Sequence, residues 1–342
     1  MDTKVKNNSL QAAPDIFSWQ TQVWQHLWQA KQQQRLAHAL LFLGTEGIGT
    51  REFAIAFANA ILCAQPTDLG NWCKECQACH LLHAATHPDL IIIEPEKTGQ
   101  RIGVDQIRDV IKSVNETTLR GGYRIIIICP STSMNTNAAN ALLKSLEEPV
   151  PNTLFILISD EGLRLPATIV SRCQKIVFPK PSHDQALQWL KTQLINEKVD
   201  PQLLLKLVNG APLRALSFLE KDLLVLREDI YQGLHSLSRG QSDPIKLAAQ
   251  WQNEDQINVI DLLLSWLTDL LRYKLTEDPT HLINSDYHNE IVKVSVGLLK
   301  NNLLAYIEHL QQTRGVLLSS VNLNKQLLLE DLLIQWTHYV SC

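Results

Sequence analysis

The sequence GTEGIGTR occupies residues 44–51, between the apolar run Ala39–Leu43 and a helical pattern that extends over residues 52–62. A strand, a glycine-rich loop and a helix in this order are typical of a phosphate-binding P-loop. The motif of such a loop is G-x-x-x-x-G-K-[ST], and it usually introduces an α/β fold built on a parallel sheet. The stretch therefore predicts a nucleotide-binding scaffold in the first half of the chain.

The residues at the four defining positions of this loop match the motif only in part. Gly44 and Gly49 occupy the two glycine positions, but Thr50 replaces the lysine and Arg51 replaces the serine or threonine. In a working P-loop the lysine contacts the β- and γ-phosphates, and the hydroxyl group binds Mg²⁺. The loop keeps the shape of a cofactor-binding site, and we expect it to bind no nucleotide.

The composition fits a globular protein with a large core. The chain has 342 residues, of which 45% are hydrophobic and 19% charged, and its net charge of -4 argues against nucleic-acid binding by bulk charge alone. Residues 1–14 are polar and predict a flexible leader without a secretory signal. The longest apolar stretch, 257–271, is interrupted by Asp261 and Asp269, so we expect no membrane helix and a cytoplasmic protein.

Strands and helices alternate over residues 36–180, which predicts a mostly parallel, doubly wound sheet. Short apolar runs predict strands at 40–43, 90–93, 125–128, 154–158 and 176–178. The run at 90–93 has no polar alternation and predicts a buried strand. Ahead of the first strand, residues 15–31 predict a helix whose tryptophans share one face and pack into the core.

The second half of the chain is predicted to be helical throughout. Pro179 and Pro181 predict a hinge after the last strand. Beyond it, residues 181–221 predict a small helical domain, and residues 222–342 predict a larger, leucine-rich all-α domain.

A cluster of cysteines interrupts the predicted nucleotide-binding fold between its first helix and its second strand. Its members are Cys63, Cys73, Cys76 and Cys79. The spacing C-x9-C-x2-C-x2-C suits a structural Zn²⁺ ion, because four thiolates can surround it tetrahedrally. Free thiols and an iron–sulfur cluster are the alternatives, and a neighbouring histidine at 80, 83 or 87 could replace one cysteine.

A second deviation from an active nucleotide site follows the predicted strand at 125–128. A hydrolysing enzyme places an aspartate, often followed by a glutamate, at this strand end to position Mg²⁺ and polarise water. Here those places hold Cys129 and Pro130. Two separate catalytic motifs are therefore altered, and the sequence predicts that the chain's own ATPase is inactive.

Two further motifs make a family resemblance specific. The sequence NALLKSLEEP stands at 140–149 and the sequence SRC at 171–173. With the cysteine spacing and the altered P-loop, they resemble the non-hydrolysing members of the clamp-loader branch of the AAA+ ATPases in bacterial DNA polymerase III. Shorter matches are HALL at 38–41, THPD at 86–89, GVD at 103–105 and NKQLLLEDLL at 324–333.

The resemblance implies a three-domain subunit. An AAA+ core at 15–180 would carry a zinc-binding insertion at 63–79, a helical lid would occupy 181–221, and a collar for oligomerisation would occupy 222–342. It also implies partners: the delta subunit and three gamma or tau subunits, in a heteropentamer that loads the sliding β clamp onto primer-template DNA. The subunit would belong to the holoenzyme of a DNA-directed DNA polymerase, a nucleotidyltransferase.

The resemblance also implies a role for Arg172. The arginine of the SRC motif is an arginine finger in this family, which reaches in trans into the ATP site of a neighbouring subunit. The alternative is an arginine that forms a salt bridge within its own domain. Arg214 lies one residue beyond the place of a nucleotide-sensing arginine, and we expect it on the surface.

Two other functions compete with this one. An ATP-binding motor subunit of the gamma or tau type requires lysine at 50, a hydroxyl at 51 and acidic residues at 129 and 130, all of which are absent. A zinc-dependent DNA-binding module requires a basic metal loop, but Lys74 is accompanied there by Asp68 and Glu75.

Overall fold

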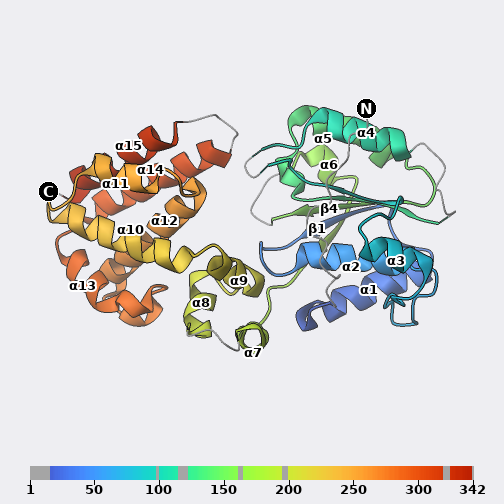
Figure 1. The fold of residues 1–342 in the computed structure, drawn as a ribbon, viewed down its shortest axis with the longest axis horizontal. Helices are drawn as coiled ribbons and strands as arrows, with labels where there is room; N and C mark the ends of the chain where they lie inside the picture. The colour runs from blue at the N-terminus through green and yellow to red at the C-terminus, as the bar shows by residue number, and fades with distance from the viewer. Residues whose placement is uncertain are drawn as a thin grey trace. The chain divides into compact units, whose positions relative to one another are not determined.

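The computed structural model describes residues 16–97, 100–114, 122–160, 165–194, 199–318 and 324–340 (Figure 1). The leader predicted at 1–14 lies outside these residues. Contacts divide the chain into two compact units, Met1–Gln185 and Ala186–Cys342. The division into core, lid and collar remains a prediction.

The described part of the first unit contains one sheet of parallel strands in the order β2-β3-β4-β1-β5. Its strands are β1 (Ala39–Leu43), β2 (Leu90–Ile93), β3 (Arg124–Ile128), β4 (Thr153–Ser159) and β5 (Gln174–Val177). The predicted α/β core with a parallel sheet is confirmed. The prediction of a buried strand at 90–93 is wrong for three of its four residues. Strand β2 lies at the sheet edge, with only Ile93 buried, because it pairs on one side alone.

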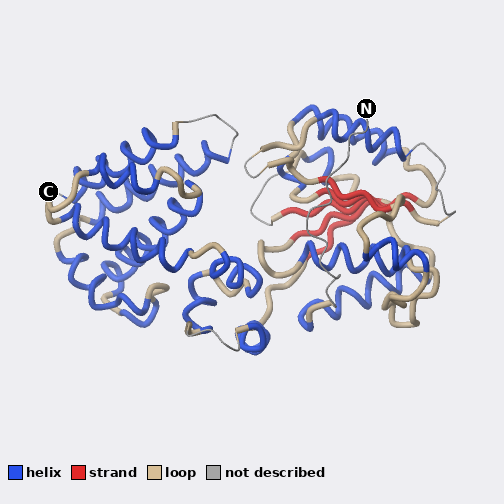
Figure 2. Tube along the Cα trace, in the orientation of Figure 1, coloured by secondary structure: helices blue, strands red, loops and turns tan. Residues whose placement is uncertain are grey.

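Helices cover both faces of this sheet, which lies between two helical layers (Figures 1 and 2). One face carries α1 (Thr21–Gln32), α2 (Thr50–Leu62) and α3 (Gln77–His83), and the other carries α4 (Val104–Val114), α5 (Thr136–Glu147) and α6 (Ala167–Val170). Successive strand residues face opposite layers. Leu41 therefore joins the core under α4 and α5, whereas Phe42 packs against Phe53 of α2 and against Phe178.

The described part of the second unit is entirely helical (Figure 2). Its elements are α7 (His183–Gln193), which begins just before the boundary, α8 (Pro201–Leu207), α9 (Pro212–Glu220), α10 (Leu223–Ser238), α11 (Pro244–Trp251), α12 (Gln256–Thr276), η3 (Pro279–His281), η4 (Ser285–Tyr287), α13 (His288–Val296), α14 (Lys300–Leu318) and α15 (Lys325–Val340). Helix α12 packs against α10, α13 and α14, and α15 packs against α11. Among the described residues, every helix is too short or too polar to span a membrane.

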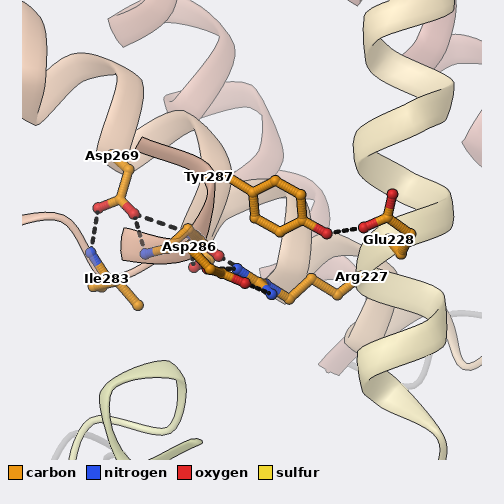
Figure 3. A network of polar contacts seen from close by, with 8 residues as sticks. Arg227, Glu228, Asp269, Ile283, Asp286 and Tyr287 are labelled. Atoms are coloured by element: carbon orange, nitrogen blue, oxygen red, sulfur yellow. Dashed lines mark hydrogen bonds and ion pairs between the residues drawn. The ribbon is translucent and has the colours of Figure 1, made fainter. Parts of the chain in front are cut away.

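Asp269, one of the two aspartates that interrupt the apolar stretch 257–271, serves as a buried hydrogen-bond acceptor. Asp269 is fully buried and accepts the backbone N–H groups of Ile283 and Asn284 at 3.0 and 2.7 Å (Figure 3). Arg227 of α10 forms two hydrogen bonds with Asp286, at 2.6 and 2.8 Å. This network fastens the segment between α12 and α13 to two helices, since buried polar groups require partners.

Candidate functional site

Backbone geometry explains both glycines of the loop at 44–51. Gly49 has a φ of +88°, which disfavours any residue with a Cβ atom. A Cβ atom on Gly44 would lie 2.7 Å from the hydroxyl oxygen of Thr50. The loop therefore keeps the two residues that give it its shape.

Carbonyl groups of the loop are bound by the short helix η1 (Ser18–Gln20). The indole N–H of Trp19 donates to the carbonyl oxygen of Ile48 at 2.8 Å, and the side-chain amide of Gln20 donates to the carbonyl oxygens of Ile48 and Gly49. The ring of Phe17 lies so close to Gly49 that a Cβ atom there would meet it at 2.4 Å. Residues ahead of α1 thus fix the loop in one conformation.

An acidic side chain binds the loop through an amide group. The backbone N–H of Glu46 donates to Oδ1 of Asp160 at 2.9 Å. Amide groups of a P-loop are the donors that cradle phosphate oxygens. Asp160 directly follows β4, so a carboxylate of the chain itself takes up a donor of the loop.

Among the side chains at the altered positions, Arg51 has an ionic partner within the unit. Arg51 forms an ion pair with Glu94, with its Nε 2.7 Å from Oε1. Burial, the largest single cause, lowers the pKa of Arg51, but Glu94 together with Cys129 and Glu52 raises it, and the net shift is upward. Burial raises the pKa of the Cys129 thiol to about 12, against the effect of Arg51. The Thr50 hydroxyl is buried and has no hydrogen-bond partner in the described part of the chain.

The four cysteines converge at one point. Their Sγ atoms all lie within 4.8 Å of one another, and the shorter separations run from 3.5 Å, for Cys63 to Cys73 and Cys63 to Cys79, to 4.0 Å, for Cys63 to Cys76. A tetrahedral ion with metal–sulfur bonds of about 2.3 Å requires sulfurs about 3.8 Å apart. The group could therefore hold a metal ion, and none of the neighbouring histidines belongs to it among the described residues.

Backbone amides prepare the cluster for negative charge. The N–H groups of Cys73, Cys76 and Cys79 donate to the sulfurs of Cys63, Cys73 and Cys76 at 3.3 to 3.4 Å. Burial raises the pKa of Cys76, but amide donors that include the N–H of Cys79 outweigh it and lower the pKa to about 6. Burial raises the pKa of Cys63 and of Cys79. The thiols oppose one another's ionisation, and a bound cation would remove that conflict.

Tryptophans of α1 hold the loop that leads into the cluster. The indole N–H of Trp28 donates to the carbonyl oxygen of Asp68, and that of Trp24 donates to the carbonyl oxygen of Leu69, each at 2.9 Å. Both rings are buried, so the predicted core-packing face of this helix is confirmed. The indole groups add specific bonds that the periodicity of the sequence did not reveal.

Arg172 lies far from the loop of its own chain. It stands just before β5, which pairs with β1 so that Gln174 lies opposite Leu40. Gly44 follows the other end of β1, so the length of this five-residue strand, about 17 Å, separates Arg172 from the glycine loop. Arg172 forms an ion pair with Glu147, the last residue of α5. Arg214 belongs to the second unit and is exposed, as predicted. Its Nη2 lies 3.4 Å from Oδ2 of Asp261.

Comparisons with known proteins agree across both units. Residues 19–182 match the family model described as DNA polymerase III, delta subunit, and residues 221–338 match the model of its C-terminal part. The DNA polymerase III subunit delta' of Pseudomonas aeruginosa is 38% identical over 323 residues, which are 94% of this chain and 97% of the relative. The chain belongs to the delta' subunit family of DNA polymerase III. The delta' subunit of Escherichia coli is 31% identical over 95% of this chain and 96% of its own length.

A subunit of another kind is also similar to this delta' family member. The subunit tau of Bacillus subtilis DNA polymerase III is 29% identical over 269 residues, which are 71% of this chain and 47% of tau. The delta' subunits of Pseudomonas aeruginosa and Escherichia coli match this chain over nearly their full length, whereas tau matches over about half of its own.

The structure adds residues that the sequence did not single out. Phe17, Glu94 and Asp160 all contact the glycine loop or its altered side chains. Glu147 lies within the NALLKSLEEP motif, but its pairing with Arg172 joins α5 to the turn that follows α6. Only the place of Asp160, two residues after the strand predicted at 154–158, offered a sequence signal.

Proposed function

We propose that this chain is a clamp-loader subunit that hydrolyses no ATP and supplies Arg172 to the ATP site of a neighbouring subunit. The position of Arg172 carries the proposal. It lies at the amino ends of the strands, whereas the glycine loop lies at the carboxyl end of β1. An arginine separated from its own loop by the length of a strand can serve a phosphate only on another chain.

The contacts of the glycine loop support the absence of a bound nucleotide. Asp160 takes up the N–H of Glu46, and a carboxylate at that point repels phosphate. Arg51 is paired with Glu94, and Cys129 stands where a carboxylate would hold Mg²⁺. The scaffold in this proposal has a mechanical task, which is to place Arg172.

The proposed chemistry of Arg172 is electrostatic. A guanidinium group supplied in trans stabilises the charge that develops on the transferring phosphoryl group, and it increases hydrolysis by about 10³- to 10⁵-fold. Its planar fork matches phosphate oxygens in pairs, which a lysine cannot do. One third of the Arg172 side chain is exposed, so a neighbouring chain could reach it.

The proposed partners follow from the delta' family. They are the delta subunit and gamma or tau subunits in a heteropentamer, and through that assembly the sliding β clamp and primer-template DNA. The C-terminal helices would form the collar of the assembly. Since the relatives are replication proteins, we place the subunit in the cytoplasm.

We also propose that the cysteine cluster binds a structural Zn²⁺ ion. Four sulfur donors and their mutual distances support zinc, and their complete set leaves no position open for a substrate. Bound zinc would deprotonate the thiols and fix the segment between α2 and α3.

The decisive experiment replaces Arg172 with alanine and measures ATP turnover by the reconstituted clamp loader. We expect assembly to be retained and DNA-stimulated turnover to fall by at least about 10-fold. Arg108→Ala is the matched control, because Arg108 is an exposed arginine of the same unit whose one ion pair in the described part of the chain is with the exposed Asp105, at 3.4 Å. Unchanged turnover in the Arg172→Ala complex would refute the proposed role.

A motor of the gamma or tau type is the second candidate, because the tau relative is 29% identical over 71% of this chain. It predicts saturable ATP binding by the isolated chain. A calorimetric titration with ATP and Mg²⁺ separates the two candidates, and we expect no saturation at millimolar nucleotide. A DNA-binding titration of the isolated chain tests the zinc-dependent DNA-binding module in the same way.

A further inference from the structure

The guanidinium group of Arg172 forms hydrogen bonds with three oxygen atoms of the first unit. Its Nη1 donates to the carbonyl oxygen of Thr168 at 2.9 Å and to the hydroxyl of Ser171 at 3.4 Å. Its Nη2 donates to Oε1 of Glu147 in an ion pair. Only Glu147 carries a negative charge, and only Glu147 comes from another secondary-structure element.

The position of Glu147 is fixed by the packing of α5. Leu142 and Leu146 of this helix are buried in the core against the sheet. Asn135 caps its first turn by accepting the N–H of Ala138 at 2.8 Å. At its last turn, Nε2 of His38 lies 2.9 Å from the carbonyl oxygen of Leu146. The carboxylate of Glu147 is thus presented by a helix that is anchored at both ends.

The exposure of the pair limits its strength. The side chains of Arg172 and Glu147 are 33% and 49% exposed. Ion pairs this exposed contribute little to the free energy of folding. The same weakness would let a phosphate group of higher charge compete for the guanidinium. A buried pair would instead hold the arginine against any partner.

An unrestrained arginine side chain populates many rotamers, and ordering it during a reaction costs entropy. A carboxylate that narrows this population beforehand lowers that cost in the transition state. We propose that Glu147 is a positioning residue, which orients Arg172 for its action on a neighbouring subunit's ATP. This inference rests on the proposed function of Arg172.

The neighbouring carboxylate provides a matched control. Glu148 follows Glu147 directly and is exposed, but no ion pair joins it to Arg172 among the described residues. Glu148→Gln removes the same charge from the same helix end without touching the contact. Differences between the two variants therefore report the contact and not the local electrostatic potential.

The test uses reconstituted clamp loaders that contain Glu147→Gln, Glu148→Gln, Arg172→Ala or the double variant Glu147→Gln/Arg172→Ala. We expect Glu147→Gln to lower the kcat of DNA-stimulated ATP hydrolysis by about 3- to 10-fold, with an unchanged KM for ATP. Glu148→Gln should match the unaltered complex, and the double variant should match Arg172→Ala. Thermal unfolding of each subunit should be unchanged, which separates positioning from a loss of stability.

Three results would overturn parts of this scheme, and they differ from one another. If Arg172→Ala lowers turnover and Glu147→Gln does not, Glu147 has no positioning role. If Glu147→Gln raises turnover, the ion pair is a brake and the inference is wrong. If Arg172→Ala itself leaves turnover unchanged, the proposed function fails first, and the inference fails with it.

Discussion

The cysteine cluster and the glycine loop belong to the same unit and adjoin opposite ends of α2. The cluster keeps four sulfur atoms whose mutual distances fit a metal ion. The glycine loop keeps its backbone shape, but its amide and carbonyl groups bond to side chains of the chain itself. In the proposed function the first site takes its ligand, a zinc ion, from outside the chain, whereas the polar groups of the second site bond to side chains of the chain itself.

The consecutive helices η1 and α1 together contact both sites. Trp19 bonds to the glycine loop, and Trp24 and Trp28 bond to the loop before the cysteines. At each site an indole N–H donates to a backbone carbonyl group of the loop. These helices therefore position backbone at both sites.

The largest effect is expected from removing a sulfur. Cys79→Ser, at a fully buried position, should abolish metal binding and destabilise the first unit by more than about 4 kcal/mol, because loss of a metal is among the most damaging changes. Zinc content by elemental analysis and urea unfolding would measure both results. Cys173→Ser is the control, since Cys173 is a half-buried thiol outside the cluster. Full zinc content in Cys79→Ser would contradict the assigned ligand set.

The second effect concerns the shape of the glycine loop. Gly49→Ala should destabilise the first unit by about 2–4 kcal/mol, from a disfavoured φ and from the clash with Phe17. Gly210→Ala is matched in φ, at +78°, but has no atom within 4 Å of the added Cβ. It should cost only about 1 kcal/mol. Equal losses in urea unfolding would show that Phe17 does not hold the loop.

A smaller effect is expected from breaking the ion pair between Arg51 and Glu94. Glu94→Gln should lower the free energy of unfolding by less than about 1 kcal/mol, because both partners are about one third exposed. Asp105→Asn, which breaks the more exposed pair with Arg108, serves as the reference. If Glu94→Gln lowers the free energy of unfolding by several kcal/mol, the ion pair is essential to the stability of the unit, and this prediction is wrong.

The smallest effect is expected from restoring the motif. Thr50→Lys combined with Arg51→Thr recovers the P-loop sequence, but Asp160 would still take up the N–H of Glu46. Cys129 would still offer no carboxylate to Mg²⁺. We expect the Kd for ATP to stay weaker than about 1 mM, a binding free energy above about -4 kcal/mol, in a calorimetric titration. Micromolar ATP binding by this variant would show that Thr50 and Arg51 alone prevent nucleotide binding in the natural sequence.

Most strands of the first unit could be predicted from apolar runs, because a strand buried on both faces consists almost entirely of apolar residues. The runs at 125–128 and 154–158 predicted β3 and β4 to within a residue at each end. The run at 90–93 predicted β2 but not its position, since its composition resembles that of a central strand although it lies at the edge. The order of strands in the sheet depends on the crossover connections, and it cannot be predicted from the residues of one strand.

The two sites were predictable to different degrees for a physical reason. Metal ligands must be cysteines at short spacings, so their sequence almost defines the cluster. The substitutes at the glycine loop come from Phe17, Glu94 and Asp160, which are far apart along the chain and of ordinary types. No periodicity or motif brings such residues together before the sheet has formed.

The sequence by itself determined the glycine loop, the loss of its lysine, the four cysteines and the arginine of the SRC motif, because each depends on residue types at fixed spacings. Tertiary structure alone decided that Asp160 occupies an amide of the loop and that Glu147 holds Arg172. It also decided that Arg172 lies at the opposite strand ends from its own loop. The first of these facts follows from the parallel pairing of β1 with β4 and the last from the pairing of β1 with β5. Pairing is a property of the folded sheet.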